Sequence, residues 1–272
     1  AATINAHRVI ACGDAEIMIA GGVEHMTRAP YVTSKSAKPF GTDAQMFDSS
    51  FGWRFVNPKM KSMFGTDAMG ETAENLADLH KISREDQDRF AHWSQQKAAT
   101  AQQKGIFSEE IAPVPLPAGK DGKSVFFEKD EFIKPATSLE GLAKLRPAFR
   151  KENGTVTAGN ASGLNDGAAA LLLSSEKASE KFGFAPKVRI LSSGVAGVEP
   201  RIMGLGPVEA SRRALERARL SLDKMDVIEL NEAFAAQVLA CTRTFGLADD
   251  DPRINPNGGA IALGHPLGCS GA

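Results

Sequence analysis

Hydrophobic and polar positions follow one another along the chain in patterns that predict helices and strands in turn. Residues 3–11 are rich in Ala, Ile and Val, and the pattern stops at Gly13, which predicts a helix that ends there. The short apolar run over 15–23 closes on a pair of glycines and predicts a buried strand. Ser83 can cap a further helix that reaches Gly105, because large side chains recur there at helical spacing.

The second half of the chain shows the same alternation. We expect core residues at 155–173, followed by a short exposed helix at 176–182 and a strand at 188–191. A helix from Pro207, a strand at 225–230 and a helix over 231–245 should then follow. Proline suits the first position of a helix, which is why the Pro207 helix should begin there. Strands and helices in this order indicate the α/β class, with helices covering a sheet.

The chain divides into stretches of different character. From about 27 to 150, Pro, Gly and scattered aromatic residues predict a loop-rich subdomain inserted into the α/β core, with a turn at 119–122. A link at 183–187 separates two expected units, residues 1–180 and residues 185–272.

The composition narrows the classes of function. The 32 Lys and Arg residues nearly balance the 33 Asp and Glu residues, and the net charge of −1 argues against a nucleic-acid binder. No apolar run approaches the roughly 18 residues of a membrane span. Three cysteines far apart predict a reducing compartment such as the cytoplasm, and their spacing relative to the five histidines predicts no metal site.

Three polar clusters could carry chemistry. Asn231 follows an apolar strand at a junction that favours developing negative charge, although spacing alone favours a role as the cap of the next helix. His265 lies between Gly and Pro on a glycine-dense loop, as an acid–base group or as a structural loop residue. Ser162 lies in a small-residue loop that lacks the G-x-S-x-G elbow, so it predicts a ligand contact or a turn rather than a nucleophile.

Six motifs together resemble the thiolase family. They are GGVEHM at 21–26, ETAEN at 71–75, TAGNASG at 157–163, MGLGP at 203–207, NEAF at 231–234 and NGGAIALGHP at 257–266. They run in order from one end of the chain to the other. Within the family, GWRFVNP at 52–58 is similar to the thiolases that act on 3-oxoadipyl-CoA in the breakdown of aromatic compounds.

The resemblance implies a fold and an activity. The fold would be a five-layer αβαβα arrangement of two similar βαβ-type halves, with an inserted loop subdomain that covers coenzyme A. The activity would be CoA-dependent thiolytic cleavage of a 3-oxoacyl-CoA through a cysteine acyl-enzyme, for example of 3-oxoadipyl-CoA to succinyl-CoA and acetyl-CoA. Coenzyme A would be a co-substrate with no bound cofactor, and the assembly would be a homodimer or homotetramer.

The resemblance also implies roles for individual residues. His265 matches the histidine that activates the nucleophile and helps hold the thioester oxygen, and Asn231 matches the residue that positions an oxyanion-hole water. Contacts to CoA carry over to Ser162 for the pantetheine arm, to Met69, Phe149, Met203 and Phe234 for the tunnel, and to Lys134 for the nucleotide phosphates. Lys134 could equally be an ordinary solvated lysine.

The cysteines do not fit the family pattern. The resemblance implies that both reactive cysteines lie outside residues 1–272, so we expect the chain by itself to have no thiolytic activity. We expect Cys12 and Cys241 to be small buried residues and Cys269 to pack in a loop. Two alternatives stay open, namely a non-catalytic CoA-binding relative and an acetoacetyl-CoA thiolase. The second is less favoured because Ala68 stands where biosynthetic members usually carry His.

Overall fold

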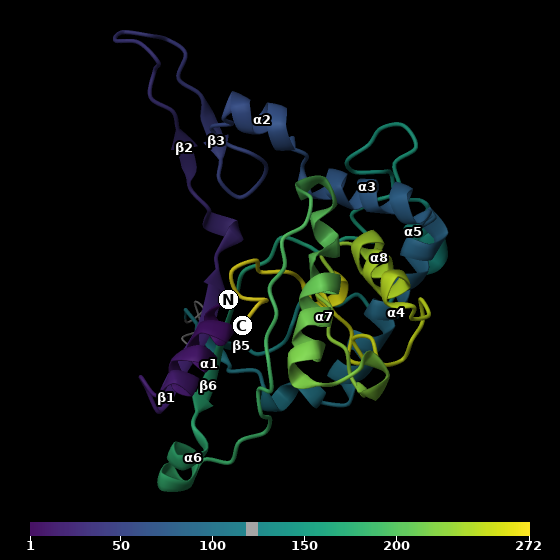
Figure 1. Ribbon diagram of the computed structural model, residues 1–272. Helices are drawn as coiled ribbons and strands as arrows, with labels where there is room; N and C mark the ends of the chain where they lie inside the picture. The colour runs from purple at the N-terminus through teal and green to yellow at the C-terminus, as the bar shows by residue number, and fades with distance from the viewer. Residues whose placement is uncertain (118–124) are drawn as a thin grey trace.

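Helices form the centre of the molecule, and a long antiparallel ribbon and a projecting arm lie to one side of it (Figure 1). The computed structural model describes residues 1–117 and 125–272, so the turn expected at 119–122 lies outside the described residues. Within the described residues, the strands form three two-stranded sheets. In the same residues, no helix has both the length and the apolarity that crossing a membrane requires.

The helical core contains α3 (Met69–His80), α4 (Arg84–Gln103), α8 (Ala235–Phe245) and α9 (Ala260–Leu263). Small and aliphatic side chains let these helices pack closely, and residues 235–242 of α8 are all buried. The helix α8 is buried on every side because α3, α4 and α7 (Gly206–Ala218) pack around it. Two of the helices in this core, α3 and α4, come from the stretch 27–150.

The ribbon consists of β1 (Ile17–Glu24) and β6 (Gly167–Ser174), which pair antiparallel along their whole length, with Ala20 opposite Leu171. The helix α1 (Ala2–Cys12) packs against β1, and α6 (Glu176–Phe182) follows β6. Both chain termini lie beside this ribbon (Figure 1).

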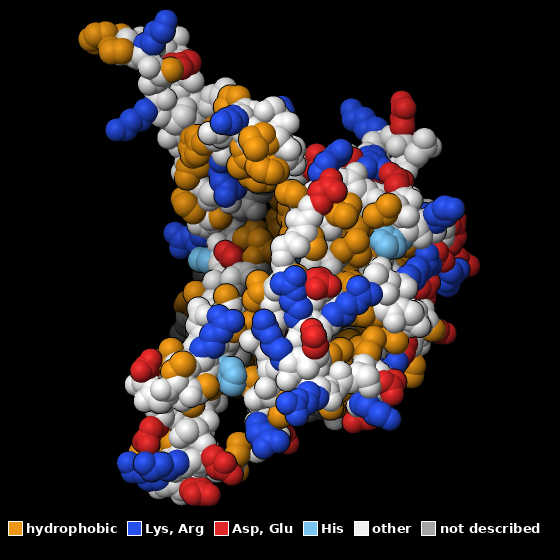
Figure 2. Space-filling view, in the orientation of Figure 1, with side chains coloured by type: hydrophobic (Ala, Val, Ile, Leu, Met, Phe, Trp, Pro, Cys, Tyr) orange, Lys and Arg blue, Asp and Glu red, His pale blue; other side chains and the backbone are white. Residues whose placement is uncertain are grey.

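A thin arm extends from the end of the ribbon (Figure 1). It is formed by β2 (Tyr31–Thr33) and β3 (Met46–Asp48), with α2 (Pro58–Phe64) beside it. Figure 2 shows hydrophobic side chains at the tip of the arm. A third pair of strands, β4 (Val114–Leu116) and β5 (Val125–Phe127), and the short helix α5 (Leu139–Ala143) complete the regular elements together with 3-10 turns, of which η3 (Pro200–Leu205) bears on the site.

Several predicted elements are confirmed. The first helix ends at Gly13, whose φ of 82° lies in the left-handed region that glycine adopts without strain. The strand predicted at 15–23 is present as β1, but the expectation that it is buried is wrong, because only Ala20 of its residues is buried. Ser83 opens α4 with a reciprocal capping box to Asp86. The helices at 176–182 and at Pro207 are also present, as α6 and α7.

Other expectations are wrong. In the described residues, 188–191 pairs with no strand and Val188 is 84% exposed, while 225–230 forms a single parallel bridge between Ile228 and Ile254. An apolar run becomes a strand only where a partner offers backbone hydrogen bonds along its length. Within the described residues 188–191 has no such partner, and 225–230 makes these bonds only at Ile228, with Arg253 and Asn255. The helix expected over 231–245 begins at Ala235 with Phe234 as its N-cap, so Asn231 is not a helix cap. Cys12 is exposed rather than buried.

Candidate active site

Asn231 and His265 are 34 residues apart in the sequence and meet in the structure. The Nδ2 atom of Asn231 lies 3.2 Å from Nε2 of His265. Asn231 occupies the irregular segment before α8, and His265 follows α9 after Gly264. Gly264 has a φ of 96°, and a Cβ atom there would lie 2.5 Å from the side chain of Asn165. A glycine is therefore required at 264 to turn the chain so that the imidazole faces Asn231.

The His265 ring is held on its other side as well. Its Nδ1 atom lies 2.9 Å from the hydroxyl oxygen of Ser270, and its backbone N–H donates to Oδ1 of Asn165 at 3.3 Å. Burial lowers the pKa of His265 below its usual value because the charged imidazolium is poorly solvated there. The ring is therefore held neutral at neutral pH, with one nitrogen able to accept a proton.

The loop that carries His265 is seated on the β1–β6 ribbon. A Cβ atom at Gly22 would lie 1.8 Å from the carbonyl oxygen of Gly268, and one at Gly167 would lie 2.5 Å from the ring of Pro266. The backbone N–H of Gly268 donates to the Glu24 carboxylate at 3.0 Å. Gly22, the second glycine of the pair in the predicted strand, therefore lets the loop approach the ribbon backbone.

A buried carboxylate supports this site, and the sequence reasoning missed it. Glu232 is 1% exposed and accepts hydrogen bonds from the Ser94 hydroxyl at 2.6 Å, from Nδ2 of Asn255 at 2.8 Å and from the backbone N–H of Ile261 at 3.1 Å. Burial raises the pKa of Glu232. These contacts join Glu232, the residue after Asn231, to α4 and to α9. In the sequence, the position of Glu232 next to Asn231 in the NEAF motif was the signal that could have identified it.

The loop that contains Ser162 is tied to the same place. The backbone N–H of Ser162 donates to the carbonyl of Ala233 at 3.0 Å, and that of Ala235 donates to the carbonyl of Asn160 at 2.9 Å. The buried Asn160 side chain donates in turn to Asp88 on α4 at 2.9 Å. Two motifs that are far apart in the sequence are thus joined by backbone hydrogen bonds, which place Ser162, half-buried, beside the start of α8.

The four expected apolar contacts lie on neighbouring elements. The rings of Phe149 and Phe234 meet edge to face with their centroids 6.0 Å apart. Phe149 also lies directly over the start of α3, since a Cβ atom at Gly70 would be 2.1 Å from its ring. The adjacent Met69 is 48% exposed, and Met203, in the turn η3 that packs on α3 and α8, is 46% exposed. The group therefore offers apolar surface near the Ser162 loop.

Lys134 lies on another side of that loop. Its ammonium group is 4.8 Å from the centre of the Phe132 ring, and its backbone N–H donates to Oε1 of Gln95 at 2.8 Å. The Phe132 ring lies against the loop, because a Cβ atom at Gly163 would be 2.4 Å from its edge. Lys134 is thus placed near Ser162 through Phe132, and its exposed charge faces solvent.

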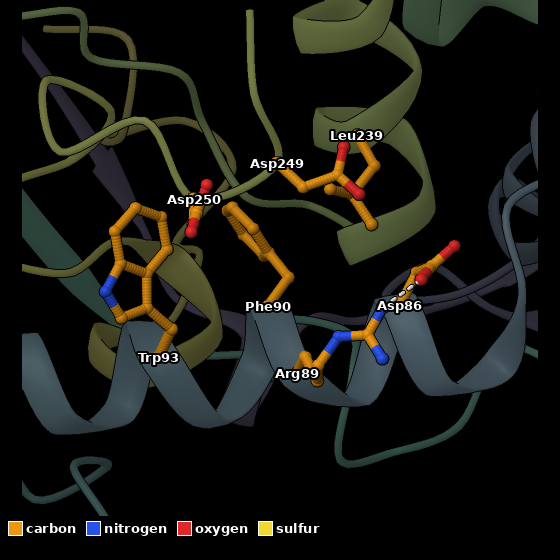
Figure 3. A pocket seen from close by; sticks show the side chains of 7 residues that line it. All are labelled: Asp86, Arg89, Phe90, Trp93, Leu239, Asp249 and Asp250. Atoms are coloured by element: carbon orange, nitrogen blue, oxygen red, sulfur yellow. Dashed lines mark hydrogen bonds and ion pairs between the residues drawn. The ribbon is translucent and has the colours of Figure 1, made fainter.

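A cavity of about 310 Å³ lies elsewhere, between α4 and the end of α8 (Figure 3). It is lined by Asp86, Arg89, Phe90, Trp93, Leu239, Asp249 and Asp250 (Figure 3). Two of its carboxylates, Asp86 and Asp249, already accept hydrogen bonds from the guanidinium group of Arg243. None of the predicted site residues lines this cavity, and Asp86 and Asp249 are engaged by Arg243 in holding α4 to the end of α8.

Comparison with known proteins places these motifs in a family. Residues 1–177 match the N-terminal domain of thiolases and residues 184–272 match the C-terminal domain. The chain belongs to the thiolase family. It is 60% identical over 267 residues to the 3-oxoadipyl-CoA/3-oxo-5,6-dehydrosuberyl-CoA thiolase of Escherichia coli K12, and 57% identical over the same length to a beta-ketoadipyl-CoA thiolase of Acinetobacter baylyi.

Solved structures agree on the fold. Human mitochondrial 3-ketoacyl-CoA thiolase superimposes with a TM-score of 0.88 at 44% identity, and its complex with CoA gives 0.86 at 43% identity. The expected thiolase fold of the α/β class is therefore confirmed. The matches with the E. coli and A. baylyi relatives take in 98% of this chain and 66% of each relative. The human structures are covered to a similar extent, 66% and 65%, so the chain spans about two thirds of the length of these relatives.

Proposed function

We propose that this chain carries the base and the oxyanion donors of a thiolase that cleaves 3-oxoadipyl-CoA to succinyl-CoA and acetyl-CoA. The observation that carries the proposal is the contact between Asn231 and His265, 3.2 Å apart on a thiolase fold. The names of the relatives at 57–60% identity support the substrate.

The chemistry requires two kinds of group at this point. Cleavage of the C–C bond of a 3-oxoacyl thioester leaves an enolate, whose oxygen needs hydrogen-bond donors already in place. The attacking thiol needs a neutral base beside it. The lowered pKa of His265 keeps its ring neutral, and the Asn231 amide supplies an N–H group at the same point. We assign the base to His265 and the positioning of an oxyanion water to Asn231.

The coenzyme A path follows from the exposed apolar surface. We assign the pantetheine contact to Ser162 and the tunnel wall to Met69, Phe149, Met203 and Phe234, which lie on adjoining elements. The exposed ammonium group of Lys134 has the charge that a nucleotide phosphate would attract. Coenzyme A is a co-substrate in this proposal.

The nucleophile is not among the three cysteines of this chain. Burial raises the pKa of Cys241 to about 11, and it also raises the pKa of Cys269. Cys12 is exposed at the C-terminal end of α1. A thiol that serves as nucleophile needs a lowered pKa or an adjacent base. We therefore infer that the chain alone does not catalyse thiolysis.

The proposed assembly and location follow the family. We assign residues 1–180 and 185–272 to two thiolase halves, with loops of 27–150 covering coenzyme A, and we propose a cytoplasmic homodimer or homotetramer. Exposed apolar side chains on the ribbon and arm, among them Ile19 at 74% and Tyr31 at 69%, support association with further protein surface.

A chimera tests the activity. The 267 matching residues of the E. coli relative would be replaced by those of this chain, and thiolysis would be followed with 3-oxoadipyl-CoA and with acetoacetyl-CoA. We expect cleavage of both substrates with a higher kcat/KM for 3-oxoadipyl-CoA. In the chimera, His265→Ala should lower kcat by at least about 100-fold, because general-base catalysis contributes about that factor or more.

Matched controls separate catalysis from folding. His92→Ala removes a histidine of α4 whose Nδ1 atom contacts the Thr137 carbonyl, and it should leave kcat within a few-fold of the parent chimera. The proposal is wrong if His265→Ala retains full activity in the chimera, or if the 272-residue chain by itself cleaves 3-oxoadipyl-CoA when it carries Cys269→Ser. A preference for acetoacetyl-CoA would overturn the proposed substrate but not the proposed reaction.

A further inference from the structure

The His265 ring has a hydrogen-bonding partner at each of its two nitrogens, and the two partners differ in what they can offer. The amide nitrogen of Asn231 can only donate, whereas the Ser270 hydroxyl can donate one hydrogen bond and accept others. We propose that Ser270 is a positioning residue that fixes the tautomer of His265, so that Nδ1 carries the proton and Nε2 carries the lone pair. This inference rests on the proposed role of His265 as the base.

The hydrogen bonds around the ring are consistent with one position for the Ser270 hydroxyl proton and one for the imidazole proton. Ser270 donates its hydroxyl proton to the carbonyl of Pro266 at 3.1 Å, so its oxygen is left to accept. The acceptor faces Nδ1 of His265 at 2.9 Å, which places the ring proton there. Nε2 is then unprotonated and accepts from the Asn231 amide at 3.2 Å. A neutral imidazole has one donor and one acceptor nitrogen, and this network uses both.

The turn that carries Ser270 is fixed at several points, so the hydroxyl is placed by the backbone. The N–H groups of Cys269 and Ser270 both donate to the carbonyl of Pro266 at 2.9 Å. The N–H of Gly268 is bound to Glu24, and the Cys269 side chain is buried. The Pro266 carbonyl, which accepts the hydrogen bond from the Ser270 hydroxyl, is therefore itself part of a closed turn. Because the turn already holds the Ser270 hydroxyl in place, the imidazole ring does not have to be reoriented during the reaction.

The role has a chemical consequence for the proposed reaction. A base that takes a proton from a thiol needs an unprotonated nitrogen, and in this tautomer that nitrogen is Nε2. Its lone pair accepts from the Asn231 amide here and becomes available to a thiol when the amide releases it. If the proton resided on Nε2 instead, the ring would be a donor there and could not accept the thiol proton without first changing tautomer. The Ser270 hydroxyl therefore acts on the reaction through His265.

NMR of the 272-residue chain tests the proposal without any enzymatic assay. With ¹⁵N-labelled histidine, the shifts and long-range proton couplings of the ring nitrogens report which nitrogen is protonated at a pH where the ring is neutral. We expect His265 to show a protonated Nδ1 and an unprotonated Nε2. Ser270→Ala should abolish this single-tautomer pattern, and Ser270→Thr, which retains the hydroxyl, should restore it.

Controls make each result decisive. Ser175→Ala removes a hydroxyl that accepts from Ala178 at the start of α6, and should leave the His265 signals unchanged. Unchanged backbone spectra of Ser270→Ala show that the fold is retained. The proposal is overturned if the unaltered chain has its proton on Nε2, or if folded Ser270→Ala keeps the same tautomer. Because the readout is the ring itself, it stands whether or not the chimera is active.

Discussion

The helical core and the β1–β6 ribbon both carry aliphatic side chains, and they differ in how much of that apolar surface is covered. In the core, Leu239 and Val238 are 0% exposed. In the ribbon, Leu172 is 58% exposed and Ile19 is 74% exposed, although both lie in strands of aliphatic residues. A two-stranded sheet has few neighbours to bury its faces against, whereas α8 is enclosed by α3, α4 and α7.

This difference explains why the two regions bear differently on the site. The core fixes Asn231 and Ser162 through buried hydrogen bonds around Glu232 and Asn160. The ribbon supplies a backbone platform whose glycines admit the His265 loop. The site therefore joins a closely packed region to one with substantial exposed apolar surface.

The largest expected effect is the cost of removing the same side chain from the two regions. Leu239→Ala should lower the free energy of unfolding by about 2–5 kcal/mol, because it leaves a cavity in an enclosed core. Leu172→Ala should change it by no more than about 0.5 kcal/mol, because that side chain is already exposed to solvent. Urea unfolding followed by circular dichroism measures both values. Equal losses would show that the ribbon is packed as tightly as the core.

Thiol reactivity should separate the regions next. Cys12 is exposed next to the ribbon, while Cys241 is 0% exposed in α8 and has a pKa raised to about 11 by burial. At pH 8 about one Cys241 side chain in a thousand is then a thiolate. Iodoacetamide labelling read by mass spectrometry should modify Cys12 at least about 100-fold faster than Cys241. Comparable rates without denaturant would mean that α8 opens readily.

The smallest effect concerns the dependence of stability on pH. Lys97 in the core donates to the Ile254 carbonyl at 2.5 Å, and burial lowers its pKa from 10.5 to about 8. Between these values the unfolded chain binds the proton and the folded chain does not, so the free energy of unfolding gains a contribution that rises with pH from about 8 to 10.5.

Paired methionine variants isolate that contribution. Lys97→Met should remove the alkaline rise, while Lys177→Met should retain it because the Lys177 side chain is 83% exposed beside Glu16. Urea unfolding at pH 7, 8, 9 and 10 gives the comparison. An identical pH dependence in the two variants would contradict the assigned pKa of Lys97.

The local signals in the sequence were sufficient for several elements. The glycine at 13, the capping box at Ser83, and the proline at 207 act through the backbone of a few adjacent residues, so they are visible without the fold. The strands expected at 188–191 and 225–230 failed because strand pairing depends on a distant partner.

The sequence by itself also determined the family, because six motifs in order resemble thiolases and the comparisons agree. Only the tertiary structure decided how the motifs meet. It brought Asn231 to His265, placed the Glu232 carboxylate among three hydrogen-bond donors, and set Ser270 against the imidazole. These contacts join residues from separate elements, and their energies come from burial and hydrogen-bond geometry, which no single stretch of sequence contains.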